Sequence, residues 1–222
     1  MRRQHFWIAG IVAVTGLVLI LLCGRVAGQM VMRRHEERYA ANYDALTGLP
    51  NRRAIMAKLN QYFALAKQAR QSVLIAFIDL DEFKTINDTY GHEVGDKFLV
   101  EGARRLSAGL EVGDMLGRWG GDEFIVIGLA PHSGPNAPDG AADAMRRRLV
   151  PLLIGPYTFP ECSFDYRGAS LGVVSADPSA TSRQAALQKA DQLMYADKQA
   201  RRARQSSRHS LEFLEGQRGL QT

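Results

Sequence analysis

The sequence predicts an α+β domain, in which helices flank a mixed central sheet, preceded by one transmembrane helix. Apolar runs of strand length, such as Val73–Ile78, alternate with stretches in which apolar residues recur every three or four positions, as in amphipathic helices. Two adjacent glycines, Gly120 and Gly121, lie between apolar stretches and are typical of a tight hairpin of antiparallel strands. Near the N-terminus, the run Phe6–Gly24 contains no charged residue.

This N-terminal run is long enough to cross a membrane, which takes about 20 predominantly apolar residues. A cleaved signal peptide is the alternative, because Arg2 and Arg3 precede the run and the small residues Val26–Gly28 follow it. The apolar part of a signal peptide is usually shorter, about 7–15 residues. Positive residues collect on the cytoplasmic side of a span. We therefore expect a cytoplasmic domain after the run, where the arginines are Arg25, Arg33, Arg34 and Arg38.

With 46% hydrophobic residues in 222, the chain can form one domain with a substantial core and a small additional element. Met32, Tyr39 and Leu46 are seven residues apart, which fits either a stalk that pairs across a dimer or a plain solvated linker helix. The expected organisation is a transmembrane segment over 1–28, a linker or stalk helix over 29–43, a globular domain over 44–205 and a tail over 206–222.

The first elements of the domain follow from capping residues and apolar periodicity. Asn51 is a good N-cap for a helix that we expect to run to Arg70. The run Val73–Asp79 predicts a buried strand, and Asp79 at its end is expected to face solvent at the edge of the sheet.

Two helices are expected after this strand. A short helix over Glu82–Asn87 is broken by Gly91, and a longer one runs from Glu93 to Leu110. The inward side chains of the longer helix are predicted to be Phe98, Val100 and Leu106.

The hairpin over Arg118–Ile127 reads RWGGDEFIVI and carries two adjacent carboxylates, Asp122 and Glu123. Because glycine has no side chain, a flat ligand such as a nucleobase can approach the turn closely. Carboxylates beside an open surface suit Mg²⁺ and the phosphates that it carries. An ordinary turn with a solvated acidic pair is the alternative.

The last elements are read from turn residues and periodicity. The proline-rich stretch Pro131–Gly140 predicts a loop, and an amphipathic helix should follow it to Leu153. Two strands are expected over Tyr157–Phe164 and Arg167–Ser175, joined near Asp165. The final helix is predicted to run from Ser182 to Arg204.

Several motifs together resemble the diguanylate cyclase catalytic domain, known as the GGDEF family. The resemblance covers roughly Tyr43 to Gln205 and implies a palm-like fold shared with nucleotide cyclases and polymerases. It also implies the condensation of two GTP into cyclic di-GMP with release of pyrophosphate, and a bacterial inner-membrane protein where a span is present. In chain order the motifs are DALTGLPNRR at 44–53, FIDLDEFKTINDTYGHEVGDKF at 77–98, the GGDEF hairpin, ASLGVVSA at 169–176 and ADQLMYADKQARR at 190–202.

The resemblance assigns metal-binding and catalytic roles to individual residues. Asp79, the backbone carbonyl of Leu80 and Asp122 would bind Mg²⁺ or Mn²⁺, and Asp122 would also accept the proton of the attacking hydroxyl. Glu123 would be a second contact to metal or hydroxyl. The ammonium of Lys84 would stabilise the charge that develops on the phosphates.

Substrate-binding roles follow in the same way. Asn87 and Asp96 can offer the donor and acceptor pattern of guanine's edge, and His92 matches a substrate contact of the same block. Lys198 and Arg202 are four apart on one helix face, which suits a triphosphate. The helix end departs from the family, which usually has glycine in place of Arg201 and asparagine in place of Ala203.

The resemblance also implies partners. Each domain would bind one GTP, so the reaction needs a homodimer, and its product would act on cyclic di-GMP effectors. The alternative from another class is a catalytically silent module that senses GTP or cyclic di-GMP and relays it to a partner. The net charge of +5 is clustered, and the sheet lacks the exposed aromatic pair used to stack bases, so we expect no nucleic-acid partner.

Many members of the family also bind their product through an RxxD motif before the double glycine. Here Asp114 holds the aspartate position, but Glu111 replaces the arginine. A carboxylate cannot donate to phosphate and repels it. We therefore expect little product inhibition through this motif, unless another cation such as Arg104 or Arg105 has taken over the role.

Overall fold

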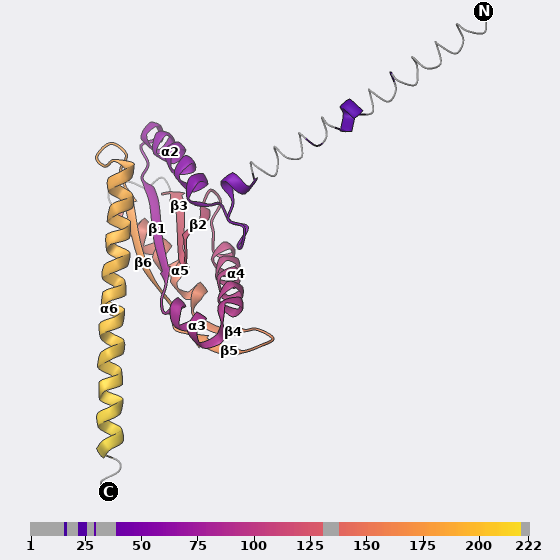
Figure 1. Cartoon of the computed structure of the whole chain (residues 1–222). Coiled ribbons are helices and arrows are strands. Elements are labelled where there is room, and N and C mark those ends of the chain that lie inside the picture. Colours follow the sequence, from indigo (N-terminus) through magenta and orange to yellow (C-terminus); the bar gives the residue numbers. More distant parts are fainter. Residues whose placement is uncertain (1–15, 17–21, 26–28, 30–38, 131–137, 219–222) are drawn as a thin grey trace, which may run out of the picture. The chain divides into compact units, whose positions relative to one another are not determined.

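The computed structural model describes residues 16, 22–25, 29, 39–130 and 138–218 (Figure 1). The chain divides into two compact units, Met1–Asn42 and Tyr43–Thr222. Within the described ranges, no helix is both long and apolar enough to cross a membrane. Most of the predicted span Phe6–Gly24 and most of the predicted stalk lie outside those ranges.

The second unit is built on a sheet with the strand order β2-β3-β1-β6. Each neighbouring pair in this sheet is antiparallel, so the prediction of a mixed sheet is wrong. The helical connections from β1 to β2 and from β3 to β6 each skip one position in the sheet. Strands joined by helices therefore run parallel but are never neighbours, because an antiparallel strand lies between them. The strands are β1 Val73–Leu80, β2 Met115–Gly120, β3 Glu123–Leu129 and β6 Ala169–Ala176.

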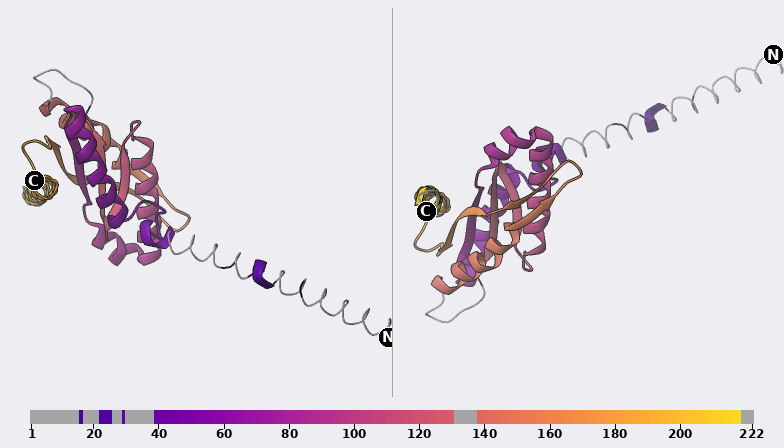
Figure 2. Two further views of the ribbon diagram at one scale, coloured as in Figure 1. Left: turned by 90° about the horizontal axis from the view of Figure 1, so that it is seen from above. Right: turned by 90° about the horizontal axis from the view of Figure 1, so that it is seen from below.

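Helices cover both faces of this sheet (Figures 1 and 2). On β1, Val73, Ile75 and Phe77 pack into one apolar cluster with α2 and α6. The alternate residues of β1 pack into a second cluster with α3, α4 and α5. This two-sided burial explains why the strand reads as a continuous apolar run. The helices are α2 Arg52–Ala69, α3 Phe83–Tyr90, α4 His92–Ala108, α5 Pro138–Leu153 and α6 Arg183–Arg218.

Most predicted elements are confirmed, with shifts at their ends. Asn51 caps α2, since its Oδ1 accepts a hydrogen bond from the Ala54 backbone N–H at 3.1 Å. Val100 was expected to point inward, but it is 41% exposed, and Leu99 is buried in its place. Helix α6 continues to Arg218, well past the predicted end at Arg204.

The segment that was predicted as one strand over Tyr157–Phe164 is instead a hairpin of β4 Gly155–Thr158 and β5 Ser163–Tyr166. Its aromatic side chains surround Phe98 of α4, with ring centroids 4.6 Å away for Tyr157 and 4.8 Å for Tyr166. Packing onto this ring stabilises the hairpin beside the sheet, because such aromatic pairs contribute beyond their buried area.

Candidate active site

Carboxylates from two strands meet at one end of the sheet. Asp79 is the partner of Glu123 in the register of β1 and β3. The backbone N–H of Leu80 donates to the carbonyl oxygen of Asp122 at 3.2 Å. The register therefore brings together Asp79, Leu80, Asp122 and Glu123, as the motifs predict.

Asp79 does not face solvent, which corrects the sequence-based expectation. It is only 5% exposed, because α6 crosses the strand end and places the Lys198 ammonium 2.6 Å from its Oδ1. A buried carboxylate needs such a partner, since burying an unpaired charge is costly. The same ion pair brings Lys198, one of the predicted substrate-binding residues, into the carboxylate cluster.

The cluster carries excess negative charge despite Lys198. Burial and the neighbouring charge of Asp79 raise the pKa of the Asp122 carboxyl above its ordinary value. Burial, followed by the charges of Asp79 and Asp122, raises the pKa of Glu123 in the same direction. A bound cation would reduce this repulsion between the carboxylates.

The oxygen atoms of this cluster fit a hard divalent cation. Asp79, Asp122 and the Leu80 carbonyl can supply oxygen ligands of the kind that Mg²⁺ prefers. In the described part of the chain, no three Asp, Glu, His or Cys side chains converge on a common metal position. A cation here would therefore take its remaining ligands from water and substrate phosphates, which is usual for Mg²⁺.

The hairpin turn is held by a residue to which sequence reasoning gave no role. The turn consists of Gly121 and Asp122, one position later than predicted, and Gly121 adopts a φ of +52°. Arg118 donates from Nε and Nη2 to the Gly121 carbonyl at 2.9 and 2.7 Å, and from Nη1 to Asp44 at 3.0 Å. Arg118 therefore fixes the backbone that presents Asp122.

The predicted guanine contacts lie at the junction of α3 and α4. The Oδ1 atom of Asn87 is buried and, within the described residues, has no hydrogen-bond partner. A Cβ added at Gly95 would lie 1.8 Å from this oxygen. The Asn87 side chain can therefore occupy its position only because residue 95 is a glycine. Asp96 and His92 are exposed on the first turns of α4. A buried acceptor beside exposed polar groups is suited to a ligand with N–H donors.

The remaining predicted phosphate contacts are exposed. Lys84 lies in the first turn of α3 and Arg202 on α6. Among the described residues, neither forms an ion pair with the carboxylate cluster, so their roles stay predictions. Arg201, which precedes Arg202, contacts Asp81 at 2.6 Å instead.

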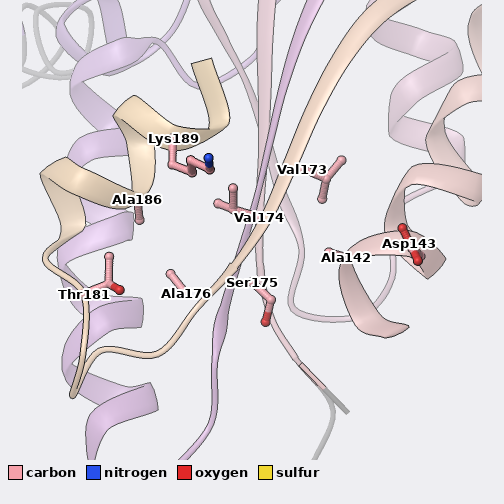
Figure 3. A pocket seen from close by; sticks show the side chains of 9 residues that line it. All are labelled: Ala142, Asp143, Val173, Val174, Ser175, Ala176, Thr181, Ala186 and Lys189. Carbon is pink, nitrogen blue, oxygen red and sulfur yellow. The ribbon is translucent and has the colours of Figure 1, made fainter. Parts of the chain in front are cut away.

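A separate pocket lies between the start of α5, β6 and the start of α6 (Figure 3). Asp143 and Lys189 line its two sides, and Ser175 lies between them. None of the predicted site residues lines this pocket. It is therefore distinct from the carboxylate cluster.

Comparison with known proteins agrees with this geometry. The profile of the family described as "Diguanylate cyclase, GGDEF domain" matches residues 41–204. The diguanylate cyclase DgcP of Escherichia coli strain K12 is 43% identical over 155 residues, which cover 70% of this chain and 44% of that protein. The chain spans less than half the length of the curated relatives that it matches.

Solved structures show the same fold. A sensory box/GGDEF family protein from Caulobacter crescentus CB15 has a TM-score of 0.64 and 34% identity, covering 72% of this chain and 99% of that chain. The coiled coil and GGDEF domain of DgcB from Caulobacter crescentus, in complex with c-di-GMP, has a TM-score of 0.66 and 25% identity, covering 81% and 93%. The chain therefore belongs to the diguanylate cyclase GGDEF domain family.

Proposed function

We propose that this chain is an active diguanylate cyclase, which condenses two GTP into cyclic di-GMP and releases pyrophosphate. The observation that supports it most is the cluster of Asp79, Asp122 and Glu123 at the sheet end, faced by the Lys198 ammonium. This arrangement combines a proton acceptor, Asp122, with an ammonium group, that of Lys198, which can bind phosphate. The names of the relatives agree with this activity.

In the proposed reaction, the 3′-oxygen of one GTP attacks the α-phosphorus of the other, and a second, reciprocal attack closes the ring, so that each attack releases one pyrophosphate. The new P–O bond forms as the bond to pyrophosphate breaks, and the hydroxyl proton passes to Asp122. Asp122 is suited to this role by its place beside Leu80 and Asp79, where the reacting phosphate would be held.

The cluster would hold Mg²⁺, or Mn²⁺, between Asp79, Asp122 and the Leu80 carbonyl, with Glu123 as a further contact. When bound, such an ion neutralises phosphate charge and lowers the pKa of the attacking hydroxyl. The Lys198 ammonium lies against Asp79 and would move to the phosphates as GTP binds. Lys84 and Arg202 would add positive charge from α3 and α6.

The base would be read by Asn87 and Asp96, with His92 beside them. The unpartnered Asn87 Oδ1 can accept from guanine, and the Asp96 carboxylate can accept from the N–H donors of the same edge. Adenine lacks that pair of donors, so this site would favour GTP over ATP.

Because each domain would bind one GTP, the active form would be a symmetric homodimer with two sites face to face. The predicted span would anchor it in the bacterial inner membrane, with the domain in the cytoplasm, where GTP is present. Cyclic di-GMP effectors would receive the product. The charge pattern of the N-terminal segment supports the orientation.

The alternative is a silent domain that binds GTP or cyclic di-GMP and relays its presence to a partner. The assay that separates the two is pyrophosphate release by the purified full-length chain with GTP and Mg²⁺, alongside equilibrium binding of a non-hydrolysable GTP analogue. Turnover supports the enzyme. Binding without turnover by a dimeric preparation would support the sensor and remove the enzyme.

A further inference from the structure

We infer that Arg201 is a positioning residue for this reaction, which holds α6 so that Lys198 can exchange Asp79 for substrate phosphate. The inference rests on the proposed function. Its basis is a second ion pair between α6 and the end of β1, next to the one that Lys198 makes with Asp79.

The second ion pair joins Arg201 to Asp81. The Arg201 Nε lies 2.6 Å from Asp81 Oδ2, and the Ser170 hydroxyl donates to Asp81 Oδ1 at 2.6 Å. Ser170 is fully buried in β6. Both carboxylate oxygens of Asp81 are therefore engaged, by a helix on one side and by the neighbouring strand on the other.

The guanidinium makes a second contact that a lysine cannot reproduce in the same geometry. Its Nη2 donates to the carbonyl oxygen of Arg167 at 3.0 Å, in the turn between β5 and β6. The planar fork of arginine can donate in two directions at once, whereas an ammonium is a point charge. Arg201 thus ties α6 to the strand end through Asp81 and to the adjacent turn through Arg167.

Lys198 and Arg201 are three residues apart on α6, so they lie on one face of the helix. Their partners, Asp79 and Asp81, are two apart along the chain. In the proposed reaction, Asp79 would help to hold the metal ion instead of pairing with Lys198, so the first ion pair would open. Asp81 is not part of the carboxylate cluster, so the second ion pair persists and keeps α6 at the strand end.

The surroundings make this second ion pair stronger than an exposed one. The side chains of Arg201 and Asp81 are 26% and 13% exposed, so solvent screens the pair only in part. Both residues also line a small pocket together with Tyr166, whose hydroxyl is buried without a hydrogen-bond partner among the described residues. Loss of the guanidinium would therefore enlarge this pocket and remove both contacts by which Arg201 holds α6, to Asp81 and to Arg167.

A double-mutant cycle on the full-length chain tests the inference. Equilibrium binding of a non-hydrolysable GTP analogue and steady-state KM and kcat are measured for wild type, Arg201→Ala, Lys198→Ala and the double variant. If Arg201 acts through Lys198, Arg201→Ala should weaken binding about tenfold, which lies within the range of couplings measured for residues of one ion-pair network. In the Lys198→Ala background, the same change should have no further effect.

Two further variants keep the result interpretable. Arg201→Lys retains the charge facing Asp81 and should recover part of the lost affinity, whereas Arg204→Ala, an exposed arginine on the same helix, should bind like wild type. If Arg201→Ala melts below the assay temperature, Arg201→Gln, which keeps most of the side-chain volume, takes its place with the same expected loss.

Wild-type affinity in Arg201→Ala, or full additivity with Lys198→Ala, would overturn the inference. So would a wild-type chain that does not bind the analogue. A wild-type chain that binds the analogue but releases no pyrophosphate would contradict the proposed function alone. The coupling between Arg201 and Lys198 could still be measured from the binding affinities of the four chains.

Discussion

The ammonium of Lys198 lies 2.6 Å from the carboxylate of Asp79, although the two residues are 119 positions apart in the chain. The contact joins the end of the central strand to the last helix. Without substrate, the lysine neutralises part of a crowded acidic cluster.

The charge crowding should be visible as a pH-dependent gain in stability for Asp122→Asn. The pKa of Asp122 is raised on folding, so its carboxyl binds a proton more tightly in the folded chain than in the unfolded chain. Such a group favours the folded state at low pH, and this contribution is lost as the pH rises from its ordinary pKa of 3.8 through its raised value.

At neutral pH, Asp122→Asn should therefore melt roughly 2–4 °C above wild type, the shift that 1 kcal/mol gives in a domain of this size. Thermal melts at pH 5 and pH 7 measure it, and the difference should be smaller at pH 5. A variant that melts below wild type at pH 7 would show that the carboxylate stabilises the fold.

Gly95→Ala should impair GTP binding through Asn87. An added Cβ would lie 1.8 Å from Asn87 Oδ1, so the amide must move away from the position proposed to read guanine. We expect KM for GTP to rise about tenfold, the cost of roughly one good hydrogen bond to a ligand. Gly140→Ala is the matched control, because nothing lies within 4 Å of its added Cβ. An unchanged KM in Gly95→Ala would remove Asn87 from the base site.

Product inhibition through the RxxD position should be weak. The cation that faces Asp114 is Arg148 of α5, at 2.6 Å, and the same guanidinium also contacts Glu111. Arg104 and Arg105, the substitutes considered from the sequence, both pair with Glu101 instead. To bind Arg148, a phosphate group of cyclic di-GMP would have to displace the carboxylates of both Asp114 and Glu111.

Titration of cyclic di-GMP into the wild-type assay should thus cause little inhibition, whereas Glu111→Arg should create it by supplying a second cation and removing a negative charge. Strong inhibition of the wild type by cyclic di-GMP, relieved by Arg148→Ala or Asp114→Ala, would contradict this prediction.

The rate should depend on dimerisation. If each domain holds one GTP, a chain shortened by residues 1–40 should lose specific activity on dilution, because the predicted span and stalk no longer keep two domains together. Activity and sedimentation are measured over the same concentration range. A monomer whose specific activity stays constant on dilution would contradict the two-site reaction.

The orientation in the membrane is testable with a reporter fused after Thr222. The arginines that follow the predicted span favour a cytoplasmic C-terminus. A reporter that is active only in the cytoplasm should therefore be active, and its periplasmic counterpart should be inactive. Periplasmic activity would favour the signal peptide and contradict an enzyme that uses GTP.

The sequence predicted the elements well where a local pattern decides them. The Asn51 cap and the hairpin at Gly121 depend on a few adjacent residues, and the continuous apolar run of β1 reflects burial on both faces. The antiparallel sheet could not be read in this way, because periodicity does not show that each helical connection skips a strand. Val100 was misplaced because an error of one residue on a helix turns a side chain by about 100°.

The site was predicted by its motifs, whereas its supports were not. Asp79, Asp122 and Lys198 match family positions and come together in the structure. The carboxylate partners of Arg118 and Arg201 are 74 and 120 residues away, so no local pattern links them. Arg201 did carry one signal, since it stands where the family usually has glycine.

The most direct test of the proposed activity is identification of the product by mass. The full-length chain is incubated with GTP and Mg²⁺, and the mixture is separated by chromatography. We expect cyclic di-GMP and two pyrophosphates per molecule of product from the wild type, and less than a few per cent of that amount from Asp122→Asn, which keeps the volume but loses the proton acceptor. A dimeric wild-type chain that binds GTP and forms no cyclic di-GMP, or an Asp122→Asn chain that forms it at the wild-type rate, would contradict the account.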